Sequence, residues 1–285
     1  MSQGRFFCAL RLQLALKPET LSLSMPFTLA HPAAVMPLRH LKYLPTLALI
    51  VGSMIPDILY YVPGRIFWTL RAAHWDTHSL FGSVFLCLPL GMLVIAGCIL
   101  LRRPLTALMT DRARWVVLQA ADSFTARPIN WLLAVPAILI GSWTHLLWDA
   151  FTHPGTWLVR RIEALSAPIT LFGVYTGEVS HVLQYASSVI GLLVLAWWYT
   201  LAASEAPLTN SRSQSGSRWL LLLLVVVAAA IIGTVQALRA HYQIPTFYSM
   251  AYLLLTRTLA WFLLLYVAAG TVLMLSERAQ PQLES

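Results

Sequence analysis

The chain has 285 residues, of which 58% are hydrophobic and 11% charged, and its mean hydropathy is +0.70. Because soluble globular proteins carry about 25% charged residues, the polar material here is too scarce to cover a soluble fold. The formal net charge of +8 would suit nucleic acid in a soluble protein, but the basic residues collect in loops without interleaved aromatic residues. Composition therefore excludes a soluble protein and predicts an all-α integral membrane protein that binds no nucleic acid.

The first 24 residues differ from the rest of the chain. Residues 1–24 are basic, and Arg11 interrupts the one apolar run that resembles a signal sequence. We interpret 1–24 as a leader or an upstream extension, with Met25 as the expected start.

Seven helical segments are predicted after Met25: a short amphipathic piece, an apolar helix interrupted near its end by Pro56, and five full-length spans. In chain order they are 27–38, 44–62, 79–101, 130–152, 180–201, 219–240 and 249–275. The fold class is thus a bundle of about five or six transmembrane helices plus short interfacial helices. The polar, Ser-rich stretch 202–217 is predicted to be a linker between a motif-bearing domain, 25–201, and two further spans within 218–285.

Basic residues predict the orientation of these spans. With alternating spans, ten Lys and Arg side chains fall on one side and five on the other. The first set is Arg39, Lys42, Arg102, Arg103, Arg112, Arg114, Arg127, Arg212, Arg218 and Arg278, and the second is Arg65, Arg71, Arg160, Arg161 and Arg239. Because cytoplasmic loops are enriched in basic residues, we expect the first set to be cytoplasmic.

Residues with metal-ligand chemistry gather at the opposite ends of the predicted spans. The candidate ligands are His31, Asp57, His74, His78, His145, Asp149, His153 and His181. With alternating spans they share one membrane face, on the extracytoplasmic side, and His31 joins them if the short first helix folds back. Neutral imidazole and carboxylate together suit zinc or a similar divalent ion, with one or two ions expected.

Spacing strengthens this prediction. His145, Asp149 and His153 stand at four-residue steps, so they stay within about 80° of one another on a helix. His74 and His78 form another pair of this kind, as in helical zinc sites. Pro56 breaks the helix, and we expect Asp57 to reach the water interface there, where a charge costs less than in lipid.

Simpler interpretations exist for single residues. His40 and His241 are expected to be amphipathic tips at the interface, and Asp76 is an alternative N-cap for the 79–101 helix. His145 and Asp149 could form a hydrogen-bonded pair without metal. His153 could instead cap the end of its helix, and Asp57 could be a turn residue after Pro56.

Four stretches, "MPFTLAHPAAVMPL", "GSMIPDILYY", "HWDTHSLFGS" and "THLLWDAFTHP", resemble a bacterial family of multi-span membrane proteins catalogued as a domain of unknown function, whose members begin at this Met-Pro-Phe. The resemblance covers about residues 25–200. More distantly, the order of His and Asp is similar to membrane-bound metal-dependent hydrolases and to the zinc-dependent phospholipase C and P1 nuclease group. That resemblance implies ligands at His31, Asp57, His78 or His74, His145, Asp149 and His153. Two departures, the lack of an N-terminal ligand and Tyr185 four residues after His181 instead of Glu, favour two metals over three.

The leading functional hypothesis is therefore a metal-dependent hydrolase of the bacterial cytoplasmic membrane, acting on a lipid or phosphoester. Asp57 and Asp149 are the candidate catalytic residues, bridging metals or acting as base. A transporter of metal ions or protons is the alternative, and a structural metal site is a third. Membrane lipid and a small-molecule or lipid substrate are the expected partners.

Overall fold

The computed structural model describes residues 28–41, 43–61, 76–171, 173, 175–207, 215–241 and 247–279. Within these ranges, five helices are long and apolar enough to cross a membrane. They are Leu80–Leu100, Ile129–Thr152, Val179–Ser204, Gly216–Arg239 and Met250–Ser276. The predicted all-α membrane bundle is confirmed, and these helices agree closely with the five full-length spans expected from the sequence.

Short helices come before the first span. They are η1 (Thr28–Ala30), α2 (Pro32–Val35), η2 (Met36–His40), α3 (Thr46–Met54) and η3 (Ile55–Tyr61). The first span consists of α5 (Leu80–Gly82), a π-helical turn η4 (Ser83–Cys87) and α6 (Leu88–Leu100). The remaining elements are α7 (Arg102–Ala107), α8 (Asp111–Thr125), α9 (Ile129–Thr152), α10 (Glu163–Ser166), β1 (Pro168–Leu171), β2 (Tyr175–Glu178), α11 (Val179–Ser204), α12 (Ser215–His241) and α13 (Phe247–Ala279).

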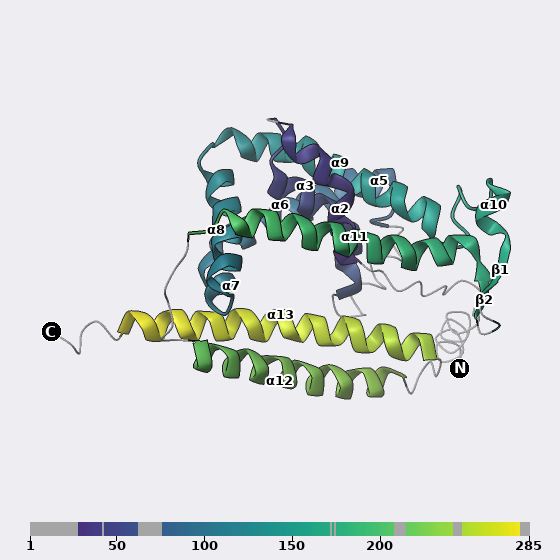
Figure 1. Ribbon diagram of the computed structural model, residues 1–285. Coiled ribbons are helices and arrows are strands. Elements are labelled where there is room, and N and C mark those ends of the chain that lie inside the picture. The colour runs from purple at the N-terminus through teal and green to yellow at the C-terminus, as the bar shows by residue number, and fades with distance from the viewer. Residues whose placement is uncertain are drawn as a thin grey trace, which may run out of the picture.

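The long helices run roughly alongside one another, with different structures at their two ends (Figure 1). Helices α7 and α8 run across one end, where the sequence predicts only a basic loop. Helix α10 and the antiparallel hairpin of β1 and β2, which the helical pattern does not predict, lie at the other end. Helices α12 and α13 pack along each other, and α13 packs on α7.

Two glycines bring α3 and α9 into backbone contact. A Cβ atom on Gly141 would lie 2.5 Å from the carbonyl oxygen of Leu49 and 2.7 Å from the backbone nitrogen of Ser53. A Cβ atom on Gly52 would overlap the backbone of Ile138. Small residues permit close helix approach in a membrane, where packing rather than the hydrophobic effect holds helices together. This crossing forms the centre of the main core and fixes α9 against α3.

We expect Gly141→Leu to force α3 and α9 apart, because the new side chain would enter the backbone of α3. Overpacking of this kind costs about 1–3 kcal/mol, so the midpoint of thermal unfolding in detergent should fall by roughly 5 °C. The matched control is Gly97→Leu on α6, since a Cβ atom there meets nothing within 4 Å. Equal melting temperatures for the two variants would contradict the tight crossing.

The ends of the bundle should lie on opposite sides of the membrane. In a chain whose Cys8, Cys87 and Cys98 are replaced by serine, we expect Ala164→Cys, near the hairpin, to react with an impermeant thiol reagent added to intact cells. Thr110→Cys, before α8, should react only after permeabilisation. The reverse pattern would invert the orientation, and equal reactivity at both positions would contradict the alternation of the spans.

Candidate metal centre

The C-terminal end of α9 supplies three side chains of the cluster. His145 Nε2 lies 3.1 Å from Asp149 Oδ2, and His153 Nδ1 lies 3.3 Å from Asp149 Oδ1. His153 is the residue that follows the last turn of α9, and its backbone N–H donates to the carbonyl oxygen of Asp149 at 2.9 Å. The four-residue steps therefore do place the three side chains on one stripe, with the Asp149 carboxylate in the middle.

Pro56 explains how α3 meets this stripe. Proline has no N–H, so Pro56 cannot donate to the carbonyl oxygen of Gly52, and from Ile55 the chain changes to 3-10 geometry. Backbone carbonyls at the end of α3 are thus left for side-chain donors. The hydroxyl of Ser142 donates to Gly52 O at 3.2 Å, and His145 Nδ1 lies 2.8 Å from Ser53 O.

Asp57, on the following turn, is buried rather than at the water interface. The expectation that it reaches water is wrong: the side chain is 1% exposed because η3 packs into the bundle. Its carboxylate instead accepts a hydrogen bond from the Thr28 hydroxyl at 2.7 Å and lies 3.1 Å from His78 Nε2 and 3.5 Å from His145 Nε2. A buried carboxylate requires such partners.

His78 is held in place by its neighbours at the start of the first span. The hydroxyl of Thr77 donates to Pro56 O at 2.6 Å, and Asp76 Oδ1 accepts from the backbone N–H of His78 at 3.0 Å. Asp76 is not the N-cap of this helix, because Ser79 occupies that position. Asp76 therefore orients the segment that carries the ligand candidate.

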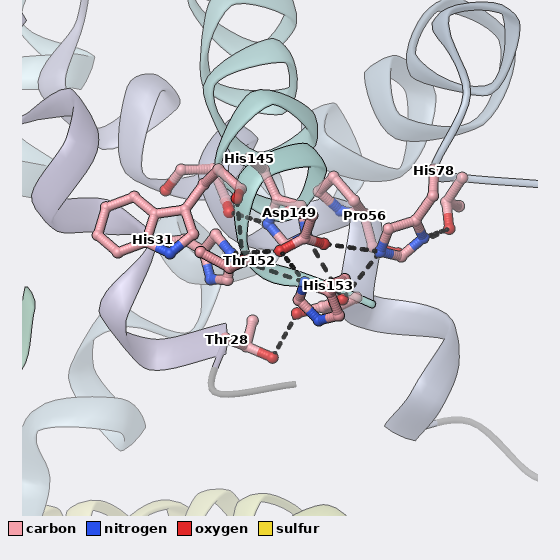
Figure 2. A network of polar contacts seen from close by, with 12 residues as sticks. Thr28, His31, Pro56, His78, His145, Asp149, Thr152 and His153 are labelled. Atoms are coloured by element: carbon pink, nitrogen blue, oxygen red, sulfur yellow. Dashed lines mark hydrogen bonds and ion pairs between the residues drawn. The ribbon is translucent and has the colours of Figure 1, made fainter. Parts of the chain in front are cut away.

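His31 reaches the cluster from the other side. Its ring stacks on that of His145 with centroids 3.9 Å apart, and its Nε2 lies 3.2 Å from Asp149 Oδ1. The first short helices do fold back, as the sequence pattern requires for His31 to take part. Figure 2 shows Asp149 between His31 and His78, with Thr28 and His153 close by.

One nitrogen in this cluster has an unusual environment. A carbonyl oxygen can only accept, so the 2.8 Å contact with Ser53 O makes Nδ1 of His145 the donor. In the neutral ring, Nε2 then carries the lone pair. This atom is fully buried and, within the part of the chain that the structure describes, has no hydrogen-bond partner, although it lies 3.1 and 3.5 Å from oxygens of Asp149 and Asp57. A lone pair facing two carboxylates is repelled unless a proton or a cation lies between them.

The side chains fall into two overlapping groups that could hold a metal ion. One is His31, His145 and Asp149, and the other is Asp57, His78 and His145, with the ligand atoms of each group within 4.8 Å of one another. Both groups use His145, whose Nε2 has one lone pair, so the two positions cannot share it at the same time. Each group is a set of two imidazoles and one carboxylate, which suits a divalent transition metal.

Helix α11 contributes Gln184 to this region. The side-chain amide nitrogen of Gln184 lies 3.1 Å from His153 Nε2. Burial lowers the pKa of His153 below its ordinary value and outweighs Asp149, which acts in the opposite direction. The lowered pKa favours the neutral ring of His153.

Two predicted ligands that the structure describes, His153 and His181, lie outside these groups. His181 packs its ring on Tyr185, with centroids 5.0 Å apart, and belongs to neither group of three. His74 lies outside the described residues. The sequence pattern does not point to Thr28 or Gln184, although each stands three residues from a candidate histidine and so lies one turn away on a helix.

The cluster borders a cavity of about 600 Å³ between α9 and the start of the first span. Asp57, His78, Asp149 and His153 are among the residues that line it. Its volume lies within the usual range for small-molecule sites. The cluster is therefore accessible to a ligand.

Comparison with known proteins identifies the family of this chain. No curated protein and no solved structure gives a significant match. A family model described as a domain of unknown function, DUF4184, matches residues 25–275, which include the cluster as well as most of α12 and α13. The chain belongs to this DUF4184 family.

Proposed function

We propose that this protein is a membrane-bound, metal-dependent hydrolase that binds zinc at the His/Asp cluster and cleaves a phosphoester. The observation that carries the proposal is the buried Nε2 of His145, which faces two carboxylates without a hydrogen bond. A proton on Nε2 would not point along a hydrogen bond to either oxygen. A cation bound between these atoms would satisfy all three.

Zinc suits the donor atoms of this cluster. Catalytic zinc is commonly held by three protein ligands and keeps one position open, and each group of two histidines and one aspartate provides three. A second ion would have to use ligands other than His145 Nε2. When bound, zinc would polarise the phosphoester and lower the pKa of a water molecule.

Burial assigns different roles to the two carboxylates. Asp57 is 1% exposed, and Thr28 fixes one of its oxygens, which leaves the other turned toward His78 and His145. Asp149 is 14% exposed and borders the cavity. We assign Asp57 as a fixed ligand and Asp149 as the group that also takes a proton from the attacking water.

The reaction is the addition of water to phosphorus. A bond forms from the water oxygen to phosphorus as the P–O bond to the departing alcohol breaks. One proton of the water passes to that alcohol and the other stays with the phosphate product, so that no further reactant is required. The extracytoplasmic face, inferred from the basic residues at the other ends of the spans, is the side on which the reaction would occur.

Location in the bundle favours a hydrolase over a transporter. A transport pathway needs polar groups through the depth of the membrane. The cluster instead combines the last turns of α9 with the start of the first span and the end of the short apolar helix.

The first test is the metal content of protein purified in detergent. We expect about one to two equivalents of zinc, because the two ligand groups share His145. His145→Ala and Asp149→Ala should each lose at least one equivalent. Elemental analysis covering zinc, iron and manganese, after zinc loading and removal of free metal, measures this.

Two histidine variants serve as controls. His181→Ala and His40→Ala should keep the zinc content of the wild type, because His181 lies outside both ligand groups and His40 is exposed at the end of η2. A folded wild-type protein that stays free of metal would refute the proposal. It would leave the cluster as a set of buried imidazole–carboxylate pairs.

The second test concerns Thr28, whose hydroxyl donates to the carboxylate that we assign as a ligand and also lies 3.0 Å from the hydroxyl of Tyr61. Loss of a group that orients a metal ligand typically costs about 10–100-fold in metal affinity or activity. We expect Thr28→Val to weaken zinc binding by that factor, measured by competition with a chelator, and Thr28→Ser to restore it. Thr170→Val on the exposed hairpin is the control. An unchanged affinity in Thr28→Val would contradict the role of the Thr28–Asp57 hydrogen bond.

A further inference from the structure

We infer that the substrate is a membrane phospholipid that enters the site sideways from the bilayer. The reaction that it undergoes rests on the proposed function, whereas its binding rests on the cavity alone. The cavity is lined both by charged and imidazole groups of the cluster and by the apolar residues Leu80, Trp143, Leu146, Leu147, Ala150 and Trp157. An amphiphile with a charged headgroup and a hydrocarbon chain matches both kinds of lining.

Helix α9 carries two neighbouring stripes. Gly141, His145 and Asp149 face α3, as their contacts show. Leu147 and Ala150 belong to the stripe that lines the cavity, at the helical spacing of one face. Because Asp149 borders both stripes, a ligand in the cavity would touch the cluster directly.

Two exposed leucines of membrane-spanning helices line this cavity. Leu80 on the first span and Leu147 on α9 line it, and they are 69% and 54% exposed. In a membrane bundle, an exposed leucine on a spanning helix contacts lipid tails rather than water. A lipid could therefore reach the cavity from within the bilayer, between Leu80 and Leu147.

The cavity also has a suitable depth. The indole N–H of Trp143 donates to the hydroxyl of Ser83 at 3.0 Å, which joins α9 to η4 beside the inner part of the cavity. From Trp143 to Ala150 along α9 is about 10 Å, enough for part of an acyl chain. Trp157, which is 61% exposed, lies beyond the end of α9, where tryptophan favours the headgroup level. The chain would thus point into the membrane and the phosphate toward His78 and His153.

Photolabelling tests this inference without relying on activity. The protein would be reconstituted in vesicles of phosphatidylethanolamine and phosphatidylglycerol that contain a few per cent of phosphatidylglycerol with a diazirine in its acyl chain. Mass spectrometry then compares labelling around Leu147 with labelling around Leu93, an exposed leucine on α6. We expect at least a fivefold excess at the cavity, since a chain held there stays longer than a passing lipid.

Leu147→Trp should fill the cavity and abolish this excess, whereas Leu132→Trp, at an exposed position on the same helix, should leave it unchanged. The labelling ratio measures both outcomes, and wild-type elution in size exclusion confirms that the variants are folded. Equal labelling at Leu147 and Leu93 in the wild type, or an excess that Leu147→Trp leaves intact, would overturn the lipid site.

Hydrolysis separates this inference from the proposed function. Zinc-loaded protein would be given bis(p-nitrophenyl) phosphate, which is soluble, and phosphatidylglycerol in the same vesicles. Labelling at the cavity without cleavage of either compound would refute the hydrolase and support the lipid site. Cleavage of the soluble diester alone, with no excess labelling, would support the hydrolase and refute the lipid site.

Discussion

The close approach of His145 Nε2 to the carboxylates of Asp57 and Asp149 is the constraint on which the rest of this structure depends. All three groups are held inside an apolar bundle, where an unpaired charge costs several kcal/mol. Water does not reach Nε2, because that atom is fully buried. The two carboxylates need positive charge beside them, which a proton on His145 or the metal ion of the proposed function would supply.

The backbone around Pro56 explains why the ring of His145 cannot move away from the two carboxylates. Pro56 leaves the carbonyl oxygen of Gly52 without its helical donor, and the change to 3-10 geometry alters the pairing of the next turn. Ser142 and His145 donate to these carbonyls. The contact at Gly141 keeps the backbones close enough for both bonds. The hydrogen bond at Nδ1 therefore fixes the ring of His145, and with it the direction in which Nε2 points.

Much of this organisation could be predicted from the sequence, because it follows from periodicity. Apolar length identifies the five spans, and the four-residue steps of His145, Asp149 and His153 identify the stripe on α9. What could not be predicted depends on packing between distant segments. Asp57 is buried because η3 packs against α9, and no local pattern distinguishes that position from a polar helix end.

The same limit applies to α11. Histidine is the more obvious ligand, so the pattern favours His181, but the rotation of α11 against α9 brings Gln184 to His153 instead. Residues 181 and 184 are nearly one turn apart, so a modest rotation of this helix decides which one faces the cluster. Helix rotation is set by side-chain packing along the whole span, to which residues such as Ser188 and Gly191 contribute. Spacing within a helix can therefore identify which residues share a face. Which face of that helix packs against its neighbours depends on the assembled bundle.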